Sequence, residues 1–392
     1  MKPLDNITVI SIEQAVAAPF CTRQLADLGA RVIKIERPGV GDFARGYDDR
    51  VNGQASYFVW INRSKESMAL DIKQPRARQI LEKLIAKADV LVQNLAPGSL
   101  ARLELSTAEL RHRFPRLVIC DISGYGLGGP YRDRKAYDLL VQAEAGLLSV
   151  TGTPGEMVRS GISVADIAAG MYAFTNILTA LLQRSRTGKG CHIDVSLLES
   201  LTEWMGSPLY YCYQDAPQAG RSGASHPSIY PYGPFACGDG KIILMGIQNE
   251  REWSVFCKEV LGLPELKDDE RFISNTRRSD NREQLKQIIE KKFSAFNSEE
   301  IINRLDNTGI ANAAVNDIAD VWHHQQLAAR GRWVKVDTPN GVIDALLPPG
   351  INDSFSPRMD PVPAIGEHTD AILSELGFTL EEITALHEDN TV

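Results

Sequence analysis

The sequence predicts an α/β protein whose large first domain holds a parallel sheet and is followed by a smaller domain. Along residues 7–122, short apolar runs alternate with helical stretches, a pattern typical of βαβ units. The chain has 392 residues, more than the roughly 250–300 at which a single hydrophobic core usually stops growing. Apolar residues make up 43% of it, so core size is not limiting. We therefore expect two domains.

The first βαβ unit is predicted over residues 7–36. A strand at residues 9–12 leads into a helix over residues 19–28, and a second strand follows at residues 31–36. Further strands are expected at residues 68–71, 90–93 and 117–122, with a helix over residues 75–87. The turn after the first strand contains no glycine, whereas a dinucleotide-binding turn reads G-x-G-x-x-G. This turn argues against a nicotinamide or flavin cofactor.

The smaller domain is predicted to begin with a hairpin at residues 235–246, where two apolar runs flank a Gly-Asp-Gly turn. Helical periodicity follows over residues 252–261, 282–293 and 298–307, and again over residues 365–376. The expected organisation is the N-terminal part of the large domain (1–200), a linker (201–234), the small domain (235–320), and a return linker with the C-terminal part of the large domain (321–392).

Composition narrows the possible partners. The formal net charge is −8 and no basic stripe is present, which argues against a nucleic-acid partner. Six cysteines lie without short paired spacing, and the N-terminus has no apolar signal core, so we expect a reducing cytoplasm and no metal cluster. The longest apolar helical stretch is interrupted by Thr175, Asn176 and Thr179, which argues against a membrane span. A polyanionic ligand would need a local cationic patch.

One carboxylate, Asp166, stands at the start of an otherwise uncharged helical stretch. Its neighbours Val164, Ala165, Ile167 and Ala168 solvate it poorly, and no salt-bridge partner lies within two turns. Such an oxygen can attack an acyl carbon. It can equally cap the helix, which contributes about 1 kcal/mol. The segment alone favours the cap.

Five motifs carry a resemblance to a known family. They read L-G-A-R-V-I-K-I-E-R-P-G-V-G-D (28–42), N-R-S-K-E-S-M-A-L-D-I-K (62–73), A-D-V-L-V-Q-N-L-A-P-G-S-L-A-R-L (88–103), T-G-K-G (187–190) and G-E-H-T-D-A-I-L-S-E-L-G (366–377). The chain resembles the class III coenzyme A transferases, the formyl-CoA transferase and carnitine CoA-transferase family, which also contains the α-methylacyl-CoA racemases. The resemblance implies a Rossmann-like large domain, a smaller α+β domain and an interlocked homodimer.

The resemblance also implies a function, and it reverses the preference for a cap at Asp166. Family members are expected to use this aspartate as a nucleophile that forms an acyl anhydride and then a CoA thioester. Coenzyme A is a co-substrate, and no metal or permanently bound cofactor is implied. The positions that match family CoA contacts are Val16, Ala17, Arg37, Leu70, Asp71, Ile72, Lys73, Asn94, Leu95, Ala96, Arg102, Lys135 and Tyr137. Their guanidinium and ammonium groups would supply the cationic patch for the phosphates.

Two departures from formyl-CoA transferases bear on the acid substrate. Val16 replaces a glutamine, and residues 219–233 replace a glycine run that closes over the acyl site. Formate and oxalate specificity is therefore in doubt. Arg221 and His226 in the replacement are candidates to hold the distal carboxylate of a dicarboxylic acid of four or five carbons, such as succinate, mesaconate, itaconate or citramalate. A plain turn position before Pro227 is an equally good interpretation of His226.

A racemase needs two proton-handling groups on opposite sides of the α-carbon. In that branch of the family a His-Asp pair stands where this chain has Tyr137 and Asp138, and a glutamate stands near Gln248. Epimerisation is therefore disfavoured. Asp138 either orients its surroundings as a second acid or caps a helix before Leu139. An intramolecular CoA transferase, an epimerase and a noncatalytic CoA-binding protein remain as alternatives.

Overall fold

A computed structural model describes the whole chain, Met1–Val392, which divides into two compact units. The first unit contains Met1–Gly146, Ser160–Gly206 and Leu327–Val392. The second contains Leu147–Arg159 and Ser207–Gln326. The chain thus leaves the first unit twice and returns to it twice.

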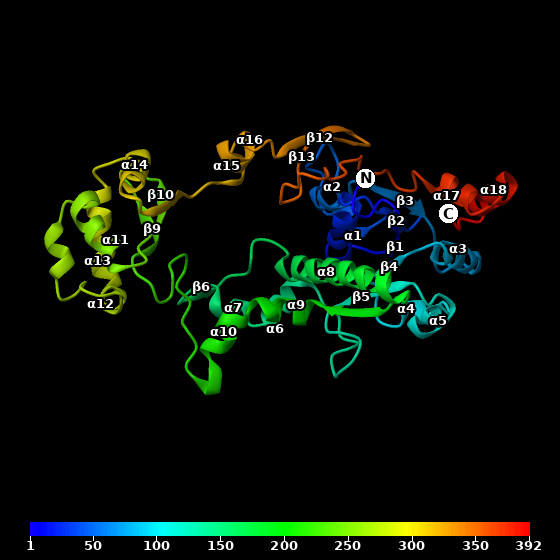
Figure 1. The fold of residues 1–392 in the computed structure, drawn as a ribbon, viewed down its shortest axis with the longest axis horizontal. Helices are drawn as coiled ribbons and strands as arrows, with labels where there is room; N and C mark the ends of the chain where they lie inside the picture. Colours follow the sequence, from blue (N-terminus) through cyan, green and yellow to red (C-terminus); the bar gives the residue numbers. More distant parts are fainter. The chain divides into compact units, whose positions relative to one another are not determined.

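The first unit is built on six parallel strands in the order β3-β2-β1-β4-β5-β8 (Figure 1). The strands are β1 (Thr8–Ile12), β2 (Arg31–Glu36), β3 (Lys65–Ala69), β4 (Val90–Gln93), β5 (Val118–Ser123) and β8 (His192–Ser196). The predicted α/β class with a parallel sheet is confirmed. The third strand was predicted three residues too late, because Lys65 and Ser67 are polar and nevertheless buried. The equally polar strand β8 was not predicted.

Helices cover both faces of this sheet, and the central strands are mostly apolar, although β1 buries Ser11 and β2 buries Lys34 and Glu36. One face, with Ile10, Ile33 and Leu91, forms a continuous core with the helices on that side. Those helices are α3 (Pro75–Ala86), α4 (Ser99–Arg102), α5 (Thr107–Arg113), α17 (Thr369–Glu375) and α18 (Leu380–Glu388). The other face is covered by α1 (Ala17–Asp27) and α8 (Val164–Thr187), which pack against each other (Figure 1).

The C-terminal segment closes the outer edge of β3. The backbone N–H of Ala69 donates to Oγ1 of Thr369 at 2.9 Å, and the N–H of His368 donates to the carbonyl of Ser67 at 3.0 Å. An open strand edge is a template for unwanted pairing with other chains. Here residues from the far end of the sequence occupy it, and Figure 1 shows α17 and α18 in red near the C-terminus.

Shorter elements complete the first unit. They are η1 (Phe43–Gly46), α2 (Ser56–Asn62), α6 (Asp138–Glu144), α9 (Leu197–Trp204) and the antiparallel pair β12 (Trp333–Thr338) and β13 (Gly341–Leu346), while α16 (Gln325–Ala329) joins the two units in sequence. Helices α1 and α8 approach closely at Gly170, where an added Cβ would lie 2.7 Å from the carbonyl oxygen of Ala17. The absence of a side chain at Gly170 allows this approach.

The second unit has its own core and a three-stranded antiparallel sheet in the order β11-β10-β9. The strands are β9 (Tyr232–Ala236), β10 (Ile242–Gly246) and β11 (Ala311–Ala314), and the short pair β6 (Gly152–Thr153) and β7 (Glu156–Met157) forms a hairpin. The helices are α7 (Leu147–Val150), α10 (Gly206–Tyr211), η2 (Tyr213–Asp215), α11 (Glu250–Val255), η3 (Phe256–Val260), η4 (Pro264–Asp268), α12 (Asn275–Asp280), α13 (Arg282–Phe293), α14 (Ser298–Thr308) and α15 (Ile318–Trp322). The hairpin predicted at residues 235–246 is confirmed.

Helix α8 is long and apolar enough to cross a membrane, judged by length and composition alone. This property carries little weight, because a core helix passes the same test. The hydroxyls of Thr175 and Thr179 and the amide of Asn176 all donate to carbonyls of the preceding helical turn. The helix therefore continues through these three polar residues, which interrupt only its run of apolar side chains.

Candidate active site

The carboxyl edge of the six-stranded sheet gathers the residues predicted to bind CoA. The strand order reverses between β1 and β4, and ligands of open α/β sheets bind at such a reversal. The loops after these two strands are joined, because the N–H of Gln14 donates to Oδ1 of Asn94 at 2.9 Å and Nδ2 of Asn94 donates to the carbonyl of Gln14 at 2.8 Å. The remaining predicted positions follow β2, β3, β4 and β5 at the same edge.

The predicted CoA residues differ in what they can offer a ligand. Val16, Ala17 and Leu70 are buried, so only their backbone groups are available, and Ile72 and Leu95 pack partly against the core. By contrast, Lys73 and Lys135 are exposed to solvent. Lys135 also lines an open hollow of about 420 Å³ with Tyr125 and Arg134. These cations suit the phosphates of a nucleotide-like ligand.

Two predicted arginines are already engaged within the protein. Arg37 donates from Nε and Nη2 to the carbonyl of Gly41, at 3.3 and 3.1 Å, and lies 4.5 Å from the ring centre of Phe43. Arg102 donates from Nη2 to Oγ of Ser99 at 2.8 Å. Each guanidinium has five N–H donors, so both retain donors for a phosphate.

A buried charge network fixes the loop between β1 and α1. Ala15 has a positive φ of 62°, and its N–H donates to Oδ1 of Asp42 at 2.9 Å. Oδ2 of Asp42 binds Nζ of Lys34 at 2.7 Å, and Glu13 binds Lys34 and Lys65 at 3.3 and 2.7 Å. Burial lowers the pKa of Lys65 to about 8, although Glu13 opposes this. Because breaking a buried pair leaves an uncompensated charge, the network holds the loop in one conformation.

Asp166 lies in the first turn of α8, three positions after the N-cap residue Ser163. Its carboxylate accepts no hydrogen bond from the protein and has no ion pair, as the sequence predicts. The capping interpretation of Asp166 is wrong, because another residue caps this helix. Oδ1 of Asp138 accepts from the N–H groups of Ala165 and Asp166 at 2.8 and 3.3 Å.

Asp138 is the first residue of α6, but it does not cap that helix. Its second oxygen, Oδ2, accepts from Nε2 of Gln142 at 2.6 Å, and Oε1 of Gln142 accepts from the N–H of Ser160 at 2.9 Å. Gln142 is fully buried. Of the two interpretations of Asp138, the one that it orients its surroundings fits the structure.

The surroundings of Asp166 make it an unusually basic carboxyl. Burial, together with the smaller effect of the nearby charge of Asp138, raises the pKa of Asp166 to about 7. A helix N-terminus ordinarily lowers a carboxyl pKa. Here Asp138 accepts hydrogen bonds from the first N–H groups of the helix, and its negative charge disfavours ionisation of Asp166. A carboxylate of higher basicity is a stronger nucleophile, and near pH 7 about half of it is ionised.

Two residues near this carboxyl were missed from the sequence. Burial raises the pKa of Tyr47, and the charges of Asp42 and Asp166 act in the same direction. No motif marks Tyr47, which becomes a neighbour only through folding. Gln142 could have been found, because Gln and Asp four positions apart on a helix form a recognised pair.

The predicted substrate residues Arg221 and His226 belong to the second unit. Arg221 donates from Nε to the carbonyl of Thr153 at 2.8 Å and from Nη2 to the carbonyl of Pro154 at 3.1 Å. It thereby holds the β6–β7 hairpin. His226 lines a cavity of about 370 Å³ within this unit.

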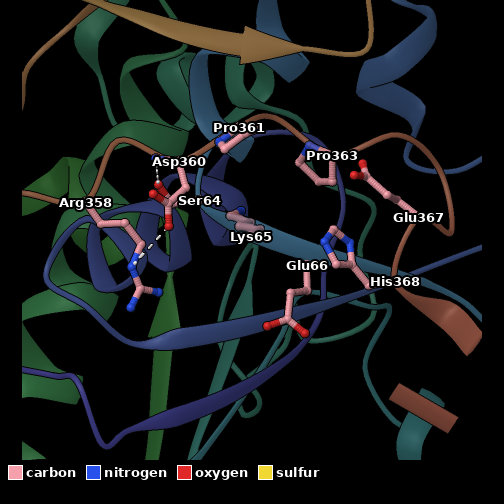
Figure 2. Close-up of a pocket in the computed structure, with 9 residues that line it drawn as sticks. All are labelled: Ser64, Lys65, Glu66, Arg358, Asp360, Pro361, Pro363, Glu367 and His368. Atoms are coloured by element: carbon pink, nitrogen blue, oxygen red, sulfur yellow. Dashed lines mark hydrogen bonds and ion pairs between the residues drawn. The ribbon is translucent and has the colours of Figure 1, made fainter. Parts of the chain in front are cut away.

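A separate cavity of about 280 Å³ lies where β3 begins, at the amino edge of the sheet (Figure 2). Its lining includes Lys65 and Arg358. Lys65 is bound to Glu13, and Arg358 donates to the carbonyls of residues 29 and 30. Because these groups are engaged and no predicted site residue lines it, this cavity is not the catalytic site. Nowhere in the chain do three or more His, Cys, Asp or Glu side chains gather to hold a metal ion.

Comparison with known proteins gives a consistent result. A family model described as CoA-transferase family III matches residues 4–369. The succinyl-CoA:glutarate CoA-transferase of Mus musculus is 35% identical over 96% of this chain and 87% of its own length. The acetyl-CoA:oxalate CoA-transferase of Acetobacter aceti is 36% identical over 85% of this chain and 86% of its own. A solved CAIB/BAIF family protein from Brucella suis is 31% identical, with a TM-score of 0.86 over 96% of this chain and 99% of its own.

Proposed function

Because the chain belongs to CoA-transferase family III and is a CoA-transferase, we propose that it moves coenzyme A between dicarboxylic acids of four or five carbons, with Asp166 as the nucleophile. The observation that carries this proposal is the state of that carboxyl. It has no partner within the protein, and burial raises its pKa to about 7. One turn further along α8, Gly170 packs against Ala17, one of the predicted CoA residues.

The proposed reaction exchanges acyl bonds without ATP or a redox partner. An Asp166 oxygen attacks the thioester carbon of the donor, the C–S bond breaks, and CoA leaves as a thiolate beside an aspartyl acyl anhydride. The thiolate then attacks the Asp166 carbonyl, which releases the first acid and leaves an aspartyl-CoA thioester. The second acid attacks this thioester and releases the thiolate again. Attack of the thiolate on the new acyl carbon yields the product and restores Asp166.

The residues around Asp166 have defined roles in this proposal. The anhydride must be protected from water, and the half-buried position of Asp166 limits its contact with solvent. Asp138 positions the first turn of α8 through two N–H groups, and Gln142 holds Asp138. Lys73 and Lys135 would bind CoA phosphates.

The acid substrates are proposed from chemistry and relatives together. The Mus musculus relative is named for succinyl-CoA and glutarate, and succinic and glutaric acids are both dicarboxylic. The Acetobacter aceti relative is named for oxalate, so a test panel should include that acid despite the sequence departures at Val16 and residues 219–233. We place the enzyme in the cytoplasm as an interlocked homodimer, in keeping with six free cysteines and the family resemblance.

The decisive experiment is mass spectrometry of peptides after mixing the enzyme with succinyl-CoA and quenching. We expect a CoA adduct on the peptide that contains Asp166. Asp166→Ala should lose the adduct and at least about a thousandfold in turnover. The matched control is Asp268→Asn, at an exposed carboxylate in the second unit, which should keep both.

The alternatives give different outcomes in the same assays. A wild-type rate in Asp166→Ala, or an adduct on another residue, would refute the assignment. Deuterium entering the α-carbon without an acceptor acid would indicate epimerisation. Transfer within mesaconyl-CoA alone, with no transfer to any added acid, would indicate an intramolecular transferase.

A further inference from the structure

Asp42 joins two loops that carry predicted CoA residues. Its carboxylate is buried, and Oδ1 accepts from the N–H of Ala15 and from the N–H of Ala44, both at 2.9 Å. Ala15 lies in the loop between β1 and α1, directly before the predicted CoA residues Val16 and Ala17. Ala44 lies in η1, which follows β2. One oxygen atom therefore ties the loop after β1 to the loop after β2.

The loop after β2 rests on the two neighbours of Asp42 in the sequence. Arg37, another predicted CoA residue, donates to the carbonyl of Gly41, and its guanidinium lies 4.5 Å from the ring centre of Phe43. Gly41 and Phe43 flank Asp42 directly. A displacement of Asp42 would therefore move the support of Arg37 as well as that of Ala15.

Ala15 depends on its hydrogen bond to Asp42 because the backbone of Ala15 is strained. Its φ is 62°, a left-handed conformation that is uncommon for a residue with a Cβ. Such a conformation persists only where the surrounding contacts impose it. The next residue, Val16, is the N-cap of α1, and its side chain does not cap the helix, which leaves backbone donors there for a ligand. The direction of these donors depends on the φ of Ala15.

Charged side chains fix the carboxylate of Asp42 in turn. Its Oδ2 accepts from Nζ of Lys34 at 2.7 Å, and both side chains are fully buried. The N–H of Asp42 donates to Oε1 of Glu36 at 2.9 Å, and Arg45 holds Glu36 through two hydrogen bonds. Both oxygens of Asp42 thus have donors within the protein, so this carboxylate is not a group that reacts with a substrate.

We propose that Asp42 is a positioning residue for coenzyme A, which acts through Ala15 and makes no contact with the coenzyme. By holding Ala15 in the left-handed conformation, Asp42 directs the backbone of Val16 and Ala17 toward CoA. It also keeps Arg37 at a fixed position relative to them. The inference rests on the proposed function, because it assigns the support of the predicted CoA residues of the same transferase.

Asp42→Asn removes the carboxylate at nearly constant volume. The groups that bind its oxygens, on Ala15, Ala44 and Lys34, are all donors, whereas asparagine offers one acceptor oxygen. The amide nitrogen must therefore face either the two N–H groups or the ammonium. Adding Ala15→Gly to this variant lowers the cost of the left-handed conformation, because glycine adopts a positive φ readily.

The matched control is Asp27→Asn. Asp27 is also a buried aspartate of the first unit, and it pairs with Arg23 and Arg63. It is the last residue of α1, so it lies at the opposite end of that helix from Ala17. Its replacement should lower the melting temperature, as Asp42→Asn should, but leave the affinity for CoA unchanged.

The measurements are the Kd of CoA by isothermal titration calorimetry, the KM for succinyl-CoA, kcat and the melting temperature. Asp42→Asn should raise the Kd and the KM about five- to thirtyfold, the factor that corresponds to the energy of a left-handed alanine. Its kcat at saturating succinyl-CoA should stay close to wild type, and the adduct on Asp166 should still form. The double variant with Ala15→Gly should recover part of the affinity for CoA.

Three results would overturn the inference. A wild-type Kd in Asp42→Asn, despite a lower melting temperature, would leave Asp42 with a structural role alone. An equal loss of affinity in Asp27→Asn would trace the effect to general destabilisation. No recovery on adding Ala15→Gly would exclude the conformation of Ala15 as the route.

A second variant covers the case in which Asp42→Asn does not fold. Ala15→Val leaves the buried ion pair intact, but a β-branched residue tolerates a positive φ poorly, so this variant should also weaken CoA binding. A wild-type Kd in Ala15→Val would equally overturn the inference. CoA binding is measured without turnover, and the adduct on Asp166 is measured separately, so failure of this inference and failure of the proposed function can be distinguished.

Discussion

Replacing Asp166 with asparagine should stabilise the protein at neutral and alkaline pH. The folded protein holds the pKa of Asp166 at about 7, whereas the ordinary value is 3.8. Below both pKa values the carboxyl is protonated in the folded and the unfolded state, so Asp166 makes no pH-dependent contribution to the free energy of unfolding. As the pH rises from 4 to 7, the unfolded chain releases the proton first, so the stability of the wild type falls over this window. Above pH 7 the carboxyl is ionised in both states, and the full loss of folding stability is present.

The magnitude follows from the same two pKa values. Their difference is about 3 units, and each unit corresponds to about 1.4 kcal/mol, which gives at most about 4 kcal/mol. Partial access of water to the carboxyl reduces this figure. Asparagine cannot ionise, so the unfolding free energy of the variant lacks this decrease between pH 4 and pH 7. The two proteins should be similar near pH 4, and Asp166→Asn should be the more stable by pH 8.

Urea unfolding followed by circular dichroism at pH 4.5, 6, 7 and 8 measures the effect. The quantity to compare is the difference in unfolding midpoint between variant and wild type at each pH. Asp268→Asn serves as the control, because its carboxylate is exposed and should show no such trend. A difference that does not change with pH, or a wild type that is the more stable at pH 8, would show that Asp166 is not held as a strained, desolvated acid.

Two further predictions concern the supports of this carboxyl. Asp138→Asn removes a neighbouring negative charge, so the acidic limb of the pH–rate profile should move to lower pH; an unchanged limb would exclude Asp138 as a cause of the raised Asp166 pKa. The same variant sets an amide nitrogen against Nε2 of Gln142 and should lose about 1–3 kcal/mol of unfolding free energy in a urea titration. Gly170→Ala places a Cβ 2.7 Å from the carbonyl oxygen of Ala17, so it should destabilise the protein by about 1–3 kcal/mol although alanine is the better helix former. A rise in melting temperature of that variant would contradict the close packing of α1 and α8.

The strands that could be predicted are those that contain a short run rich in apolar residues. The runs that became β1, β2 and β4 are of this kind, although β2 also buries Lys34, and their positions were correct to within one residue. Strand β3 was displaced because Lys65 and Ser67 look like surface residues, and their burial depends on Glu13 and Glu36, which lie far away in sequence. The hydrophobic pattern of a short segment does not reveal partners that lie so far away in sequence.

The nucleophile candidate could be predicted, but the reason for its basicity could not. The apolar neighbours of Asp166 were visible in the sequence. The helix cap comes from Asp138, 28 residues before Asp166, and the position of Tyr47 depends on the loop after β2. His226 was equally ambiguous, because the two backbone N–H groups that donate to its Nδ1 are brought to the ring only by the folded turn.

The bond between Ala69 and Thr369 joins residues 300 positions apart, which affects how the protein is made in the cell. A ribosome adds about 5–20 residues per second, so the outer edge of β3 waits tens of seconds for the segment that covers it. During translation, the incomplete sheet exposes the unpaired edge of β3 to other nascent chains. We expect synthesis to depend on chaperones, and premature stop codons near the end of the message to yield aggregates rather than a shortened enzyme.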